Sequence, residues 1–200
     1  GMKAAVRDMS FEELRLLDAG SWRGIEWRCE TIPELGEVLA VLPPDRLLFV
    51  EIKCGPEVLP ALEQTIRGPD DRIVFVGFSL ETLALTKQRF PGSPVLWNLS
   101  LTREDAGGWR PDAAEMIGRV RGAGIDGLGL GFCGAVNAEL VAKIRGRGLK
   151  LFVWTVDEAR AWTYLFPRDC PRVLLWPTPG TTAADLERWF GGNAEARVAC

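Results

Sequence analysis

The 200 residues have the length of one ordinary domain, and a hydrophobic fraction of 47% supplies a core and excludes a disordered chain. The net charge of −3 gives no reason to expect nucleic acid or a membrane surface as a partner. The chain has no histidine, so these residues provide no imidazole for acid–base catalysis, metal binding or nucleophile activation.

The cysteines and the apolar stretches bear on the compartment. Five scattered cysteines without a C-x-x-C pair argue against a zinc site and against a disulfide framework. No stretch approaches the ~18 consecutive apolar residues of a membrane span, and the first seven residues lack a signal-peptide core. We therefore expect free thiols, no membrane span and a cytoplasmic location.

The N-terminal part contains two helix starts. Ser10 and Glu13 have the spacing of a capping box, with Ser10 as the N-cap. Residues 31–34 predict a second helix, because apolar residues follow them at helical spacing. Residues 18–24 between the two are expected to form a loop.

From residue 47 onwards, strand and helix patterns alternate. Six apolar runs predict strands at 47–53, 73–76, 94–97, 125–130, 149–155 and 172–176. Helices are expected near 56–67, 80–89, 111–122, 137–145, 156–165 and 182–190. Unbroken alternation of this kind predicts a parallel sheet with helices packed on it.

The alternation of strands and helices is typical of two α/β architectures. A closed (β/α)8 barrel needs eight strands and ~250 residues, and the alternative is an open doubly wound sheet. No G-x-G-x-x-G follows the first strand, so nothing supports a dinucleotide fold. Gly127, Gly129 and Gly131 alternate within a strand-like run, which favours tight barrel packing over a phosphate loop.

The strand at 47–53 ends in two charged residues, Glu51 and Lys53. Charges at the end of a buried strand are costly unless they are paired or bound to something. Their side chains share one side of the strand, because strand side chains repeat every second residue. In α/β barrels the carboxyl ends of the strands carry the catalytic residues, so one group could hold a cation while the other meets an anion.

Four segments in this order suggest a family. They are Leu17-Asp18-Ala19-Gly20-Ser21-Trp22, Ile32-Pro33-Glu34-Leu35 with Val38-Leu39, Phe49-Val50-Glu51-Ile52-Lys53, and Val153-Trp154-Thr155-Val156-Asp157. The combination resembles the glycerophosphodiester phosphodiesterase family from about residue 3 to about residue 190.

The resemblance implies a (β/α)8 barrel that hydrolyses glycerophosphodiesters to an alcohol and glycerol 3-phosphate, with Mg²⁺ or Ca²⁺ at the barrel mouth. It implies that Glu51 is a metal ligand, that Lys53 lies near the substrate phosphate and that Trp154 lines the substrate pocket. Phe78, which ends the strand after Glu51, is a further candidate pocket residue.

The sequence departs from the family at both ends. Family members begin with H-R-G, E-x-D and H-D segments, which supply two catalytic histidines and two metal carboxylates, and none of these is present. The usual T-D-x-P segment is replaced by residues 175–180. We expect a TIM-type barrel domain over residues 1–190 that lacks its first two βα units, followed by a frayed tail at 191–200.

This reading carries expectations for activity and partners. The chain contains none of the family's catalytic histidines, and Glu51 alone provides too few ligands for Mg²⁺ or Ca²⁺. We therefore expect the chain alone to be inactive. A glycerophosphodiester is the expected small-molecule partner, and a second copy of the chain could cover the open strand edges. The alternatives are a non-catalytic phosphate-ester-binding or scaffold remnant of the family, and an unrelated α/β-barrel hydrolase that uses a carboxylate and a metal.

Overall fold

A computed structural model describes residues 4–155 and the backbone of residues 174–176. The chain divides into two compact units, residues 1–43 and 44–200. The helices expected at 156–165 and 182–190, and the tail at 191–200, lie outside the described residues. A single domain over residues 1–190 therefore stays a prediction.

The first unit contains two short helices, α1 (Phe11–Arg15) and α2 (Leu35–Val41). It also has two 3-10 turns that the sequence did not predict, at Val6–Asp8 and Ile25–Trp27. The predicted capping box of α1 is confirmed, because the Glu13 amide donates to the Ser10 hydroxyl (3.2 Å) and the Ser10 amide to the Glu13 carboxylate (2.7 Å).

Helix α2 begins at the end of its predicted start segment. Glu34 is the N-cap, and its amide donates to the Glu37 carboxylate at 2.8 Å. Arg15 of α1 pairs with Glu37 at 2.7 Å, so this carboxylate both caps α2 and ties the two helices together.

The second unit is built on six parallel strands in the order β1-β2-β3-β6-β7-β8. Their bounds are β1 Leu48–Ile52, β2 Ile73–Gly77, β3 Val95–Leu99, β6 Gly127–Gly131, β7 Lys150–Trp154 and β8 Leu174–Trp176. All six predicted strands are confirmed. The spatial order follows the chain order without a reversal, as in a barrel, whereas a doubly wound sheet reverses direction at a switch point.

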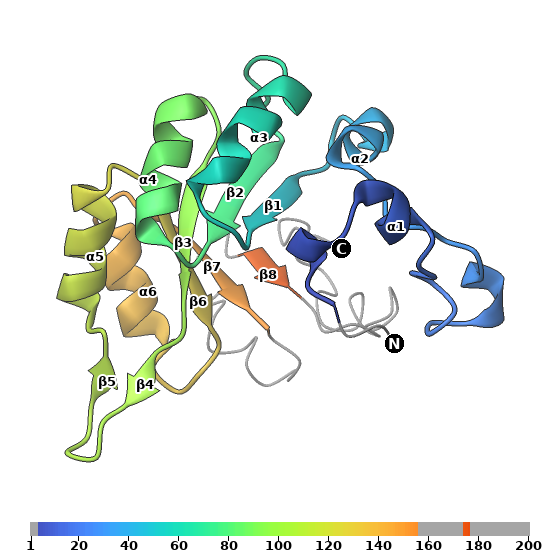
Figure 1. Ribbon diagram of the computed structural model, residues 1–200. Coiled ribbons are helices and arrows are strands. Elements are labelled where there is room, and N and C mark those ends of the chain that lie inside the picture. The colour runs from blue at the N-terminus through green and yellow to red at the C-terminus, as the bar shows by residue number, and fades with distance from the viewer. Residues whose placement is uncertain (1–3, 156–173, 177–200) are drawn as a thin grey trace. The chain divides into compact units, whose positions relative to one another are not determined.

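Helices α3 (Leu59–Thr65), α4 (Leu80–Arg89), α5 (Ala113–Gly122) and α6 (Ala138–Arg145) cover one face of this sheet (Figure 1). A 3-10 turn at Pro56–Val58 leads into α3. Ser79, Asp112 and Asn137 cap α4, α5 and α6 by accepting a backbone N–H, which fixes where each helix begins. None of the helices among the described residues is long and apolar enough to cross a bilayer.

A small antiparallel hairpin, β4 (Thr102–Arg103) with β5 (Trp109–Arg110), follows β3 and was not predicted. Two-residue strands leave too little hydrophobic alternation to detect in a sequence.

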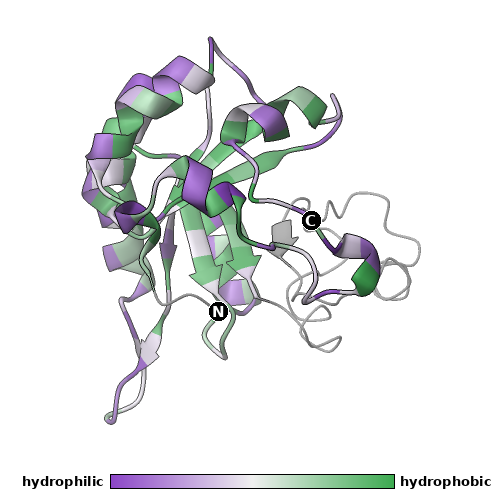
Figure 2. Ribbon diagram, turned by 45° about the vertical axis from the view of Figure 1, so that its right-hand side comes forward, coloured by the Kyte–Doolittle hydropathy of each residue, from purple (hydrophilic) through white to green (hydrophobic). Residues whose placement is uncertain are grey.

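The helix-covered face of the sheet forms the main core. Strand side chains alternate between faces, and those under the helices are fully buried. They include Ile73, Phe75, Val95, Leu128, Leu130 and Val153, each 0% exposed. Figure 2 shows the strands mostly green and the helices purple on their outer sides. Burial of these apolar side chains is the driving force that holds the helices onto the sheet.

The opposite face carries a second apolar cluster that includes Phe49 of β1 and Phe152 of β7. Their ring centroids lie 5.5 Å apart, although four strand spacings, about 19 Å in a flat sheet, separate β1 from β7. The sheet must therefore curve strongly toward this face, as a barrel wall does. Among the described strand pairings none joins β1 to β8, so a closed barrel stays a prediction. The absence of the first two βα units likewise stays a prediction.

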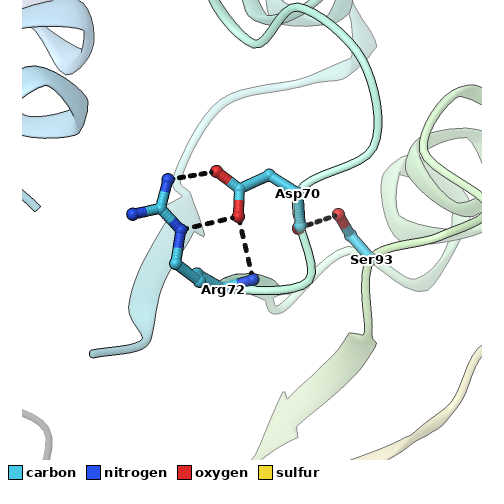
Figure 3. Close-up of polar contacts among 3 residues, drawn as sticks. All are labelled: Asp70, Arg72 and Ser93. Atoms are coloured by element: carbon cyan, nitrogen blue, oxygen red, sulfur yellow. Dashed lines mark hydrogen bonds and ion pairs between the residues drawn. The ribbon is translucent and has the colours of Figure 1, made fainter. Parts of the chain in front are cut away.

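Polar contacts tie the amino-terminal ends of the strands together. Arg72 pairs with Asp70 at 2.7 Å, and the Ser93 hydroxyl donates to the Asp70 carbonyl oxygen at 3.3 Å (Figure 3). Nearby, the Asp126 carboxylate binds the Lys87 ammonium and accepts the Val95 amide, both at 2.8 Å. Asp126, in the loop before β6, therefore has a structural role, because it holds Lys87 and the start of β3 together.

The Asp70 pair gives a pH prediction. Its hydrogen bonds from Arg72 hold the pKa of the Asp70 carboxyl below its usual range. Because the folded-state pKa is depressed, the pair stabilises the protein above the unfolded pKa of about 3.9, and the stabilisation disappears as pH falls through the folded value. We expect Asp70→Asn to lower Tm at pH 7, with the difference from wild type closing below pH 4.

Thermal melts of both proteins between pH 7 and pH 3 measure this gap. Asp45→Asn is the control, since Asp45 pairs with Arg46 in an exposed position and exposed pairs contribute little at any pH. A gap for Asp70→Asn that stays constant down to pH 3 would contradict the assignment.

Candidate functional site

The charged pair at the carboxyl end of β1 is the starting point of the site. Glu51 is the fourth residue of the strand and Lys53 follows its last residue. The Lys53 ammonium lies 2.7 Å from a Glu51 carboxylate oxygen, and the side chains are 76% and 33% exposed. Lys53 therefore neutralises Glu51 while most of its surface faces solvent, where it can meet an anion.

Both aromatic candidates lie on the same face of the sheet as this pair. Strand register aligns Glu51 with Val76, two residues before Phe78, and alternation then puts Phe78 on the Glu51 side. Following the register through β3 and β6 places Trp154 on that side too. The Phe78 and Trp154 rings meet edge to face, with centroids 5.9 Å apart. The structure thus brings all four predicted site residues to one face, at the carboxyl ends of β1, β2 and β7.

Phe78 and Trp154 differ in exposure. The Phe78 side chain is 53% exposed, which is unusual for a phenylalanine beside a buried strand. Trp154 is half-buried and packs against the cluster of Val74, Val76, Leu96 and Phe152. The two rings therefore form an aromatic surface that is exposed to solvent at Phe78. Such a surface suits the organic part of a small molecule.

Sequence analysis missed Asn98, in β3 on this same face. Asn98 is only 6% exposed, and its Oδ1 has no hydrogen-bond partner among the described residues. The Nε1 of Trp154 is likewise buried and without a partner there. A polar residue inside an otherwise apolar strand run was the available signal for Asn98.

The glycines of β6 lie between these side chains. A Cβ at Gly129 would overlap Asn98 and Phe152, and a Cβ at Gly127 would overlap the Lys150 backbone. The glycine row therefore serves close packing between neighbouring strands, which confirms the sequence interpretation.

The described residues do not by themselves fit a divalent cation. Within residues 4–155, no three Asp, Glu, Cys or His side chains gather closely enough to hold a metal. The predicted metal ligand Glu51 supplies one carboxylate, and this carboxylate is already paired with Lys53. Mg²⁺ and Ca²⁺ need about six oxygen ligands.

A pocket of about 230 Å³ lies at the other end of the strands, between the segments that lead into β2 and β3. It is lined by apolar and loop residues such as Ile66 and Phe90, together with the exposed Glu63–Arg89 ion pair. In α/β barrels this amino-terminal end serves stability, so the pocket is not a candidate active site.

Comparison with known proteins supports the family. A curated glycerophosphodiester phosphodiesterase of Caldanaerobacter subterraneus subsp. tengcongensis is 27% identical over 169 residues, which are 76% of this chain and 61% of that protein. The structure of an Oleispira antarctica phosphodiesterase in complex with the product sn-glycerol-3-phosphate matches with a TM-score of 0.65 and 26% identity, over 78% of this chain and 62% of that chain. This chain is therefore similar in sequence to a glycerophosphodiester phosphodiesterase and in fold to a phosphodiesterase of known structure.

Two further matches give weaker information about the family. A Silicibacter pomeroyi protein, assigned as a glycerophosphoryl diester phosphodiesterase, matches with a TM-score of 0.61 and 23% identity over 81% of this chain and 62% of its own, which supports the fold alone. Residues 142–200 match the model of a family of unknown function, DUF6886. The chain spans about 61% of the length of the curated glycerophosphodiester phosphodiesterase it matches.

Proposed function

We propose that residues 44–155 form part of a phosphate-ester site of the glycerophosphodiester phosphodiesterase type. The observation that carries this proposal is the Glu51–Lys53 pair, which lies at the carboxyl end of a barrel-type strand on the same face as Phe78 and Trp154. Lys53 contacts the phosphate, the aromatic pair holds the organic part, and Glu51 is one ligand of the divalent cation in a complete family site.

Hydrolysis as the resemblance implies it uses two histidines, and these 200 residues contain none. Cleavage of a phosphodiester requires a proton for the leaving oxygen, and general acids and bases near neutral pH are most often histidines. We therefore propose that the chain binds phosphate esters without hydrolysing them alone, and the alternative is a scaffold remnant that binds no ester.

Removal of the Lys53 charge tests the binding proposal. We expect Lys53→Met to weaken binding of sn-glycerol 3-phosphate at least about tenfold, because a hydrogen bond to a charged group contributes about 1.5–3 kcal/mol. Isothermal titration calorimetry measures the affinity. Lys143→Met is the matched control, since Lys143 forms an equally short pair (2.7 Å) with Glu139 on α6, away from the site.

Three outcomes decide between the readings. Selective weakening by Lys53→Met supports the phosphate contact, and equal affinity in both variants would overturn it. No binding by the wild-type chain would favour the scaffold. In a parallel assay with glycerophosphocholine and Mg²⁺ or Ca²⁺, turnover that Glu51→Ala abolishes would show catalysis without imidazole and refute the proposed dependence on it.

A further inference from the structure

Trp97 of β3 connects the helix-covered side of the sheet to the aromatic surface on the other side. Its indole Nε1–H donates to the carbonyl oxygen of Phe78 at 3.0 Å. The Trp97 side chain is buried, and a buried indole N–H usually has an acceptor. The acceptor here belongs to the backbone of the residue whose ring forms the exposed half of the aromatic surface.

Phe78 lies in the connection between a strand and a helix. Gly77 ends β2, and Ser79 is the N-cap of α4, where its hydroxyl accepts the Thr82 amide at 3.2 Å. Phe78 is therefore the single residue between two ordered elements, and the bond from Trp97 fixes the peptide group that follows it. Because the rotamers open to a side chain depend on its backbone dihedral angles, this bond restricts the directions that the Phe78 ring can take.

The Trp97 indole is itself held from the outside of the sheet. Arg119 of α5 lies over its ring, with the guanidinium carbon 4.5 Å from the ring centroid, an attractive arrangement of a cation and an aromatic face. Arg119 also pairs with Glu115, one helical turn earlier, at 3.7 Å. The contacts thus form one series from α5 through the Trp97 ring to the Phe78 carbonyl.

An exposed phenylalanine needs support of this kind to keep one position. Phe78 is 53% exposed, and side chains open to solvent change rotamer within nanoseconds. On the site face the Phe78 ring meets the edge of the Trp154 ring. A ligand that packs on a mobile ring must first restrict it, and this ordering weakens binding.

We propose that Trp97 is a positioning residue of the site, which holds the Phe78 carbonyl and so keeps the Phe78 ring where it contacts the organic part of a phosphate ester. Trp97 faces the helices and does not contact the ligand itself. The inference rests on the proposed function and adds how the aromatic surface is kept in place. Because the phosphate contacts Lys53 and not Phe78, the support acts on the organic part alone.

The test compares two ligands in Trp97→Phe, which keeps an aromatic ring beneath Arg119 and removes the N–H. We expect sn-glycerol 3-phosphate to bind about three- to tenfold more weakly, the effect of one lost neutral hydrogen bond, while inorganic phosphate binds as in wild type. Calorimetry gives both affinities. Val95→Ala is the matched control, since Val95 lies two residues earlier on the same face of β3 and is fully buried. It should lower Tm and leave both affinities unchanged.

The loss of affinity must also depend on the Phe78 ring. In a Phe78→Ala background that ring is gone, so adding Trp97→Phe should weaken sn-glycerol 3-phosphate no further. A tryptophan that only fills the core lowers Tm in both backgrounds and shows no coupling between Trp97 and Phe78 in ligand affinity.

Arg119→Leu tests the same series if Trp97→Phe does not fold. It removes a half-exposed side chain from the indole face, and it should weaken sn-glycerol 3-phosphate about twofold and inorganic phosphate not at all. Arg121→Leu is its matched control, because Arg121 lies in the same helix and donates to the Arg147 carbonyl oxygen at 3.2 Å. It should leave both affinities unchanged.

The outcomes separate the inference from the function on which it rests. If the wild-type chain binds neither ligand, the proposed function fails and the inference fails with it. If the wild type binds both and Trp97→Phe, or Arg119→Leu in its place, weakens them equally or not at all, the phosphate site stands and the positioning role is overturned. A loss that persists at full size in the Phe78→Ala background would overturn it too.

Discussion

Truncation of Phe75 to alanine is expected to lower the free energy of unfolding by about 3–5 kcal/mol. Phe75 lies in the middle of β2, is 0% exposed and stacks on Phe90 with ring centroids 4.8 Å apart. The substitution removes the buried ring and leaves a cavity that neighbouring strands and α4 cannot close. A domain stability of 5–15 kcal/mol is typical, so this single change removes a large part of it.

Urea unfolding measures the loss, and Phe78→Ala is the matched control. Phe78 follows the same strand three residues later, but it is 53% exposed and should cost less than about 1 kcal/mol. Similar losses in the two variants would contradict the assignment of Phe75 to the core and of Phe78 to a solvent-facing wall.

Replacement of Gly127 with alanine is expected to cost about 3 kcal/mol or more, at the upper end for overpacked positions. A Cβ there would lie 2.7 Å from the Lys150 carbonyl carbon and 2.8 Å from the Lys150 nitrogen. These are backbone atoms of the paired strand β7, so no side-chain rotation relieves the overlap, and β6 and β7 must separate.

Gly118→Ala is the opposite case within the same chain. Gly118 lies in α5, and apart from its neighbours and the backbone of its own helix, no described atom lies within 4 Å of the position that its Cβ would take. Alanine is favoured over glycine in a helix, so this variant should gain about 0.5–1 kcal/mol. Thermal melts of the two variants should therefore shift in opposite directions, and a tolerated Gly127→Ala would refute the close strand approach.

Local patterns in the sequence were sufficient for the elements themselves. Apolar runs bounded by turn residues predicted all six strands, and the capping box at Ser10 predicted where α1 begins. These signals work because backbone hydrogen bonding and capping depend on residues that are close in sequence. The hairpin β4–β5 escaped detection because its strands are two residues long.

The pairing of Glu51 with Lys53 was also within reach of the sequence. The two residues are separated by one position, and the period of a strand puts both side chains on one face. Their roles toward a metal and a phosphate came from the family resemblance and stay a prediction.

Only the tertiary structure decided which other side chains share the site. Trp97 and Asn98 are adjacent in β3, a strand buried on both faces, so hydrophobicity could not say which faces the helices. In the structure Arg119 of α5 lies over the Trp97 ring at 4.5 Å, and Asn98 faces the other way, toward the glycine row. The meeting of Phe78 with Trp154 depends on curvature that brings strands β2 and β7 together, a property of the whole sheet. Periodicity within one strand determines relative orientation along that strand, whereas register, curvature and helix packing determine the absolute face, and these arise only when the strands assemble.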